Sequence, residues 1–287
     1  MSLVLGALEE DRYRQDRTTR AVLPRPLRAV GIVTAERVGV VSGLAAVAEA
    51  SRRVGLRATT RSKDGARVGP GQEVLRLEGD ARRILAVERS LLNVLMHASG
   101  VASATARAVR AARGSRPRLE VWATRKTLPG LRDLEKAAVV HGGGRPHRRD
   151  LSDGVLVKNN HLALVPLEEA LRRLARREAR REGGGRPIQV EVRTADEAVR
   201  AARAGATALL VDNAPPARAR AILSVLRAAR LRRGLWVELS GGITPENVGC
   251  YRKVGADAVS LGCLTHSAEA LPFHLKLRPP RLSRRAN

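Results

Sequence analysis

The chain of 287 residues is long enough for two domains or for one α/β barrel. Because 44% of its residues are hydrophobic but only 2% are aromatic, Leu, Val, Ile and Ala must fill the core. The net charge of +25 attracts polyanions, but acidic residues are interspersed and the rings that stack on single-stranded bases are nearly absent. We therefore attribute the charge to arginine-rich, solvated helix faces such as 171–182 and predict no nucleic-acid partner, although a basic pocket for a small polyanion fits the same composition.

The first third of the chain is predicted to form a small α/β layer. The apolar runs at 29–35 and 38–43 are typical of strands, and a helical pattern follows at 44–54. A longer helical pattern begins at Asp80 and carries apolar residues three and four positions apart, at Ile84, Leu85, Leu91, Leu92 and Leu95. We allow for an interruption at Ser99-Gly100 before the helix resumes through Arg113. Residues 114–117 (GSRP) then indicate a turn and a domain boundary.

After this boundary, short apolar runs alternate with helical segments. The six candidate strands are LEVWATR (119–125), GVLVKNN (154–160), PIQVEV (187–192), ALLVDN (208–213), WVELSG (236–241) and AVSLGC (258–263). Repeated strand-then-helix order predicts a parallel sheet, and closure of that sheet would give a barrel. We therefore predict domains at 1–113 and 114–270, followed by a basic, proline-rich segment at 271–287.

The cysteines and the N-terminus indicate a reducing, aqueous location. Cys250 and Cys263 lack the spacing of a disulfide framework or a thiolate metal site, so we expect them to be reduced and structural. The N-terminal residues lack the pattern of a signal peptide, and no apolar stretch is long enough to span a membrane. We expect a cytoplasmic protein without a membrane partner.

Unusual polar residues follow the apolar part of each predicted strand, where the strand ends of an α/β barrel form one mouth. The cations placed there are Arg125, Lys126, His147, Arg148 and Lys158. Crowding these charges is costly without anions. Because arginine suits bidentate carboxylate or phosphate binding and lysine acts more as a point charge, the mixed set predicts a substrate that carries both groups.

Glycines and two acids complete the predicted mouth. The segment Ser240-Gly241-Gly242 precedes Thr244-Pro245, which resembles a helix start and favours phosphate binding. Glu191 and Asp212 follow consecutive strands. They are predicted to hold Mg²⁺ directly or through water, to bind ribose hydroxyls, or to stabilise positive charge on a ribose ring; neutralising Arg125 or Lys158 remains the alternative role.

The residues in this order resemble the quinolinate phosphoribosyltransferases, also called carboxylating nicotinate-nucleotide pyrophosphorylases, over most of the chain. The most specific segments are ERSLLN (88–93), SGVAS (99–103), TRKTLPGLRDLEKAAVVHGGG (124–144), PHR (146–148), DGVLVKNNHL (153–162), VEV (190–192), VDN (211–213), ELSGGITPENV (238–248) and SLGCLTHS (260–267). The resemblance implies an N-terminal α/β sandwich domain joined to an incomplete parallel α/β barrel, with residues 271–287 returning to the first domain.

The resemblance also implies a homodimer in which Arg89 enters the partner's active site. By motif, the quinolinate ligands would be Arg89, Arg125, His147, Arg148 and Lys158. The ligands of phosphoribosyl pyrophosphate would be Lys126, Lys158, Glu191, Asp212, Ser240, Gly241, Gly242, Gly262 and His266, with Mg²⁺ at Glu191 and Asp212. Lys126, Glu191 and Asp212 are the predicted catalytic residues.

The implied reaction displaces pyrophosphate from ribose C1 by the pyridine nitrogen and then releases CO₂. Ala123, Asn159 and the segment 15–18 depart from the family pattern and leave the surroundings of the site less well predicted than the fold. Two alternatives remain open. One is a sister transferase that acts on another base such as nicotinate, or a paralogue linked to molybdate transport, although Lys158 argues against the latter. The other is a nucleic-acid-binding protein without catalysis.

Overall fold

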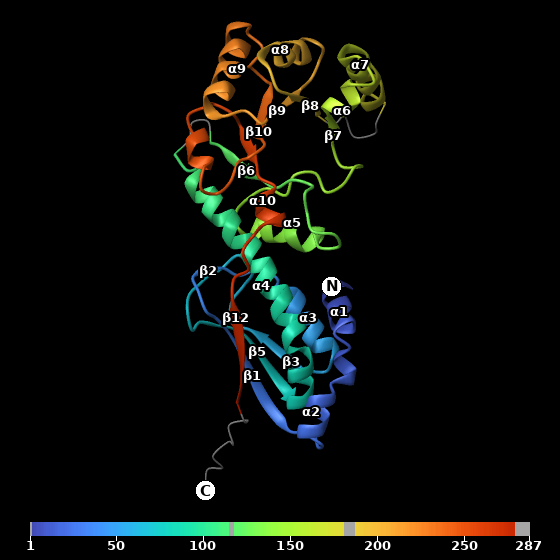
Figure 1. Cartoon of the computed structure of the whole chain (residues 1–287), viewed down its shortest axis with the longest axis vertical. Helices are drawn as coiled ribbons and strands as arrows, with labels where there is room; N and C mark the ends of the chain where they lie inside the picture. The colour runs from blue at the N-terminus through green and yellow to red at the C-terminus, as the bar shows by residue number, and fades with distance from the viewer. Residues whose placement is uncertain (1, 115–117, 181–186, 279–287) are drawn as a thin grey trace. The chain divides into compact units, whose positions relative to one another are not determined.

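The computed structural model describes residues 2–114, 118–180 and 187–278, and these fall into two compact units (Figure 1). Unit 1 contains the described residues of 1–106, 128–143 and 267–287, and unit 2 contains those of 107–127 and 144–266. Residues 128–143 therefore pack with the N-terminal unit, although they lie beyond the predicted boundary at 113/114 in sequence.

Unit 1 is built on an antiparallel sheet with the strand order β12-β1-β5-β3. Its strands are β1 (Arg28–Ala35), β3 (Arg57–Thr60), β5 (Glu73–Asp80) and β12 (Phe273–Arg278), beside a small pair, β2 (Gly39–Val40) and β4 (Arg67–Val68). Its helices are α1 (Ser2–Glu10), η1 (Tyr13–Gln15), α2 (Arg17–Val22), α3 (Leu44–Arg53), α5 (Arg132–His141) and most of α4 (Ala81–Ala111). The predicted strand at 38–43 is thus only two residues long.

Alternation along β1 determines which face of the sheet is buried. Ala29, Gly31, Val33 and Ala35 are buried, whereas the residues between them are partly exposed. A Cβ on Gly31 would lie 3.0 Å from Ile84 Cγ2, so the glycine lets α4 approach the sheet. Helix and sheet then share one apolar core.

Helix α4 is continuous, so the interruption allowed for at Ser99-Gly100 does not occur. The Ser99 hydroxyl oxygen accepts from Ser42 N at 3.0 Å and donates to Ser42 O at 3.2 Å. A Cβ on Gly100 would lie 2.9 Å from Ala270 Cα. Both residues therefore serve close packing on the helix surface rather than a break in the helix.

Unit 2 contains the six predicted strands, and all are parallel in the order β6-β11-β10-β9-β8-β7. They are β6 (Glu120–Trp122), β7 (Val155–Val157), β8 (Ile188–Val192), β9 (Ala208–Asp212), β10 (Trp236–Ser240) and β11 (Ala258–Ser260). Its further helices are α6 (Asn159–Leu162), α7 (Leu167–Glu178), α8 (Ala195–Arg203), α9 (Pro216–Ala228), η2 (Val248–Tyr251) and α10 (Cys263–His266). The prediction of a parallel, barrel-like α/β domain is confirmed.

Local sequence signals determine where several of these helices begin. Thr194 Oγ1 accepts from Glu197 N at 3.1 Å and forms a capping box at the start of α8. Helix α9 begins with proline, whose fixed φ suits the first turn. Helix α7 ends at Glu178. The last two residues of the predicted helical run at 171–182 lie outside the described range.

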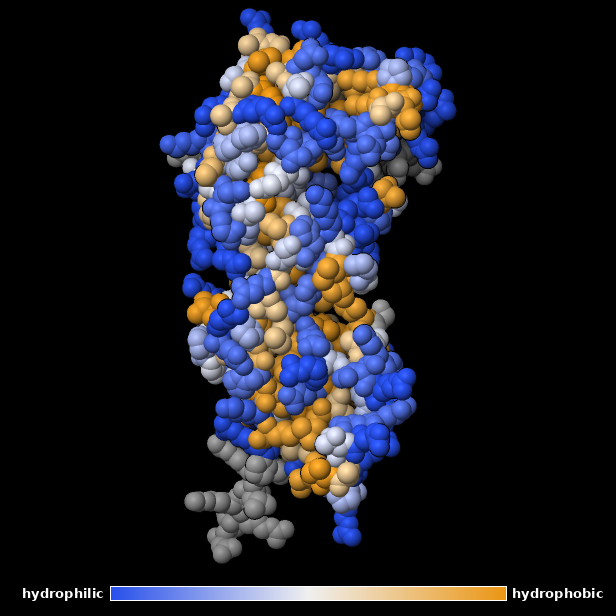
Figure 2. All heavy atoms as spheres, in the orientation of Figure 1, coloured by the Kyte–Doolittle hydropathy of each residue, from blue (hydrophilic) through white to orange (hydrophobic). Residues whose placement is uncertain are grey.

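Hydrophilic residues are spread over the face drawn in Figure 2, with apolar groups between them. Within residues 2–114, 118–180 and 187–278, no helix combines the length and apolar character needed to cross a membrane.

Candidate active site

The carboxyl ends of the parallel strands in unit 2 surround a cavity of about 300 Å³. Its lining residues are Thr124, Arg125, Lys126, His147, Arg148, Leu156, Lys158, Glu191, Leu210, Asp212, Asn213, Glu238, Ser240 and Ser260. Eight of the predicted site residues are among them: Arg125, Lys126, His147, Arg148, Lys158, Glu191, Asp212 and Ser240. Residues spread over more than a hundred positions in sequence therefore share one cavity.

The strand register places the residues that line the cavity in rows, because residues paired across parallel strands lie side by side. Ser240 pairs with Asp212 on one side and with Ser260 on the other. One row deeper, Leu210 pairs with both Glu191 and Glu238. The hydrogen-bonded pairing of the strands thus fixes where the acidic residues of the site lie.

The glycines near the mouth provide room and turn geometry. Gly241 has φ +90°, and a Cβ there would lie 2.8 Å from Asn213 N. A Cβ on Gly262 would lie 3.0 Å from Lys126 Cδ and 3.1 Å from His266 Nε2. Gly262 and His266 therefore lie beside Lys126, and Gly242 (φ +64°) continues the turn after Gly241. The three glycines and His266 are not among the residues that line the cavity.

Glu238 was not predicted as a site residue, yet it forms the buried base of the cavity with a relative exposure of only 2%. Gln189 Nε2 donates to Glu238 Oε2 at 3.0 Å, and His147 Nε2 lies 3.3 Å from Glu238 Oε1. Burial acts to raise the pKa of Glu238, but the neighbouring His147, together with Ser260 and the hydrogen bond from Gln189, outweighs it and holds the pKa below its ordinary value. The carboxylate is therefore ionised at neutral pH.

His147 is held in one orientation by its neighbours. Arg148 N donates to its Nδ1 at 2.7 Å, so Nε2 carries the hydrogen that faces Glu238. The ring lies edge-on to Trp122, with the ring centroids 5.5 Å apart, and the residue has φ +55°. A non-glycine residue in this backbone region indicates that the surroundings dictate its conformation.

The cations repel one another in the absence of an anion. Burial lowers the pKa of Arg148, and the charge of Arg125 lowers it further. Arg125 Nε is buried and has no hydrogen-bond partner among the described residues. Because a buried donor without a partner is costly, this atom indicates that a ligand acceptor belongs in the cavity.

Asp212, one of the two strand-end acids, is partly satisfied within the protein. Asp212 accepts from Asn213 Nδ2 at 3.1 Å and lies 3.5 Å from the Arg193 guanidinium. Across residues 2–114, 118–180 and 187–278, no cluster of three or more His, Cys, Asp or Glu side chains is placed to hold a metal ion. Mg²⁺ commonly keeps several waters and uses one or two carboxylates with substrate phosphates, and Glu191 and Asp212 fit that type of binding.

The predicted ligand Arg89, and two positions that depart from the family pattern, lie outside the cavity lining. Arg89 is an exposed residue of α4 in unit 1, so its entry into a partner's site remains a prediction. Ala123 is fully buried, and its N donates to Arg145 O at 2.8 Å. Asn159 begins α6, where His161 Nδ1 accepts from Lys158 N at 2.9 Å; His161 thus caps the helix that follows Lys158.

The model of the quinolinate phosphoribosyl transferase C-terminal domain matches residues 101–276, and that of the N-terminal domain matches residues 16–99. The chain belongs to the quinolinate phosphoribosyltransferase family. Family membership covers both units and includes every residue that lines the cavity.

Several relatives match nearly the whole length of the chain. A probable nicotinate-nucleotide pyrophosphorylase [carboxylating] of Methanothermobacter thermautotrophicus is 37% identical, covering 97% of this chain and 99% of that protein. The enzyme of Mycobacterium leprae is 37% identical, with 94% of each covered. The crystal structure of NadC from Streptococcus pyogenes, 34% identical, covers 96% of this chain and 95% of that one with a TM-score of 0.86.

Proposed function

We propose that this family member transfers the phosphoribosyl group of phosphoribosyl pyrophosphate to quinolinate. The products are nicotinate mononucleotide, pyrophosphate and CO₂, a step of NAD biosynthesis. The observation that carries the proposal is the convergence of two arginines, two lysines and two strand-end acids on one cavity. Such a cavity suits a doubly anionic ring together with a phosphorylated sugar.

Arg125 and Arg148 are the proposed anchors of the quinolinate carboxylates. Their guanidinium groups repel each other in the free protein, so a dianion would relieve this repulsion and give the Arg125 Nε donor an acceptor. His147 stays fixed by Glu238 and helps to set the Arg148 backbone, because it accepts from Arg148 N. Carboxylate binding then orients the ring nitrogen toward the sugar.

Glu191 and Asp212 are proposed to face the ribose, and Lys126 and Lys158 the phosphates. Mg²⁺ bound with the pyrophosphate, held by the two acids directly or through water, would neutralise charge on the leaving group. The acids stabilise positive charge that develops on the ribose ring as the bond to the leaving group lengthens. The lysines hold the departing pyrophosphate.

The proposed reaction has two bond exchanges. The pyridine nitrogen forms a bond to ribose C1 while the C1–oxygen bond breaks, and the electron pair leaves with pyrophosphate. The bond from ring C2 to its carboxylate then breaks and CO₂ departs. The electron pair stays on C2, which takes up a proton. Orientation and electrostatics suffice for both steps, so no covalent nucleophile is required.

The substrate assignment is tested by supplying quinolinate or nicotinate with phosphoribosyl pyrophosphate and Mg²⁺. We expect the mononucleotide and CO₂ from quinolinate, and loss of turnover in Arg125→Ala. Faster turnover of nicotinate would select the sister-transferase alternative. Salt-sensitive duplex binding that survives Arg125→Ala, without turnover of the wild type, would select the nucleic-acid alternative.

We further propose a homodimer that shares its active sites through Arg89, and a cytoplasmic location supported by the free thiols of Cys250 and Cys263. Arg89→Ala and Lys126→Ala should each be inactive. Random exchange of their subunits should restore about a quarter of wild-type activity, because half the dimers are mixed and each mixed dimer keeps one intact site. No recovery, despite subunit exchange shown by differently tagged chains, would contradict the shared site.

A further inference from the structure

Unit 1 contains a second cavity, of about 660 Å³, that the proposed reaction does not use. It lies among η1 and α2, the end of α3, and the junction of β5 with α4. Its lining residues are Tyr13, Arg14, Asp16, Thr19, Arg20, Arg53, Val54, Gly55, Asp80, Arg82, Arg83, Ala86 and Val87. The volume falls within the range of about 300–1,000 Å³ that is usual for small-molecule sites.

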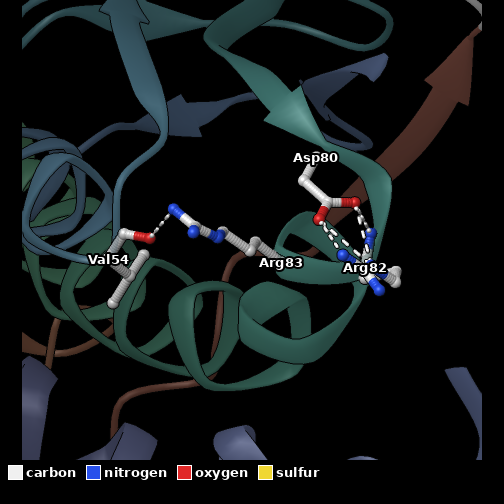
Figure 3. Close-up of polar contacts among 4 residues, drawn as sticks. All are labelled: Val54, Asp80, Arg82 and Arg83. Carbon is white, nitrogen blue, oxygen red and sulfur yellow. Dashed lines mark hydrogen bonds and ion pairs between the residues drawn. The ribbon is translucent and has the colours of Figure 1, made fainter. Parts of the chain in front are cut away.

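Five arginines but only two aspartates line this cavity, and both aspartates already have partners. Asp80 pairs with Arg82 at 2.9 Å, as Figure 3 shows, and the hydrogen bonds from Arg82 hold the pKa of Asp80 below its ordinary value. Asp16 caps α2 by accepting from Thr19 N at 2.9 Å. Hydrogen bonds from Thr19 hold the pKa of Asp16 below its ordinary value, and the charge of Arg20 lowers it further, so Asp16 offsets part of the Arg20 charge without forming an ion pair with it.

Arg20 and Arg83 contact only uncharged acceptors. Arg83 Nη1 donates to Val54 O at 3.3 Å, and in Figure 3 its side chain extends away from the Asp80–Arg82 pair. Arg20 Nη2 donates to Arg14 O. In the described part of the chain, no carboxylate lies within ion-pair distance of either guanidinium. A backbone carbonyl satisfies a donor without cancelling its charge, so an anion would be stabilised here.

The backbone makes room for one of these cations. Gly55 has φ +80°, and a Cβ at this position would overlap Arg83 Nη1. Gly55 therefore leaves room for the Arg83 guanidinium beside the residues that follow α3. Arg14 and Arg53 are paired instead with exposed glutamates, Arg14 with Glu9 at 2.8 Å and Arg53 with Glu49 at 3.3 Å.

The same cavity also has a less polar wall. Tyr13, Val54, Ala86 and Val87 line it, and the Arg14 guanidinium lies 4.9 Å from the Tyr13 ring centroid. We propose that this cavity is a nucleotide site, in which Arg20 and Arg83 bind a diphosphate and the wall around Tyr13 receives the flat base. The ligand class is a nucleoside diphosphate, or a larger molecule that contains one.

The test is calorimetric titration of the full-length protein with ADP, without Mg²⁺. Because the cavity in unit 2 also attracts phosphates, the titration is repeated in Arg125→Gln/Lys126→Gln, where binding to unit 1 should persist. Arg20→Gln/Arg83→Gln, made in that background, should weaken ADP binding by about tenfold or more for each guanidinium removed. Arg57→Gln is the matched control, because this exposed arginine of unit 1 lies outside the cavity.

The outcomes separate this proposal from the catalytic one. Equal ADP affinity with and without Arg20→Gln/Arg83→Gln, in proteins with the same melting temperature, would overturn it, and so would equal weakening by Arg57→Gln. Inorganic pyrophosphate binding as tightly as ADP would remove the base from the proposal. A single-stranded oligonucleotide that displaces ADP at far lower concentration would replace the nucleotide with nucleic acid. Quinolinate turnover bears on none of these results.

Discussion

Glu238→Gln tests the buried hydrogen bonds beneath the cavity. The substitution keeps the shape of the side chain but leaves one oxygen to serve two donors, His147 Nε2 at 3.3 Å and Gln189 Nε2 at 3.0 Å. A hydrogen bond to a charged group contributes about 1.5–3 kcal/mol, so losing one should lower kcat/KM for quinolinate by roughly 10- to 100-fold. The KM for quinolinate should rise more than that for phosphoribosyl pyrophosphate, because His147 adjoins Arg148.

The lowered pKa of Glu238 determines the pH range over which the substitution should affect activity. The pKa of Glu238 is lowered in the folded protein, so its contribution is present above the ordinary glutamate pKa and is lost only as the pH falls through the lowered value. The ratio of wild-type to Glu238→Gln activity should therefore stay constant from about pH 5.5 to 8. Glu168→Gln, which breaks an exposed pair with Arg200, is the control and should keep full activity. Unchanged kinetics in Glu238→Gln would refute the positioning role.

Three stability predictions follow from close packing and charge, each measured by urea or thermal unfolding without ligand. Gly241→Ala should destabilise the protein by more than about 2 kcal/mol, because Gly241 has φ +90° and a Cβ there would meet Asn213. Gly205→Ala is the control and should cost only about 1 kcal/mol, because Gly205 has φ +100° but faces open space. Equal losses of stability would contradict the packing argument. Glu135→Ala should cost at least about 2 kcal/mol, because His97 Nε2 and Leu128 N lose a fully buried acceptor, whereas the solvent-facing Glu49→Ala should leave the stability unchanged. Arg125→Met should abolish turnover yet leave stability unchanged or raise it by up to about 1 kcal/mol, since it relieves repulsion with Arg148; a clear loss of stability would argue that Arg125 is structural.

The parallel sheet and most of its functional ends could be predicted from the sequence because both signals are local. Apolar runs such as 208–213 show the strand, and the polar residue that ends each run shows the mouth. Glu238 was missed because it lies inside an apolar run rather than after it. Its position two residues before Ser240, on the same face of β10, was the available signal.

Long-range packing explains what sequence patterns did not show. The antiparallel strands β3, β5 and β12 carry many charged residues, and their pairing with one another or with β1 depends on contacts far apart in the chain. Residues 128–143 belong to unit 1 through contacts such as His97 Nε2 with Glu135 Oε1 at 2.9 Å. No periodicity in α5 indicates that partner.

The central claim is that one cavity joins quinolinate to the sugar phosphate and releases the ring 2-carboxylate. Quinolinate carrying an isotopic label in that carboxylate tests it most directly, with phosphoribosyl pyrophosphate and Mg²⁺ added in excess. We predict labelled CO₂ and nicotinate mononucleotide in equal amounts, both dependent on the sugar donor and both lost in Arg125→Ala. Label retained in the nucleotide, or no nucleotide at saturating concentrations of both substrates, would contradict the assignment.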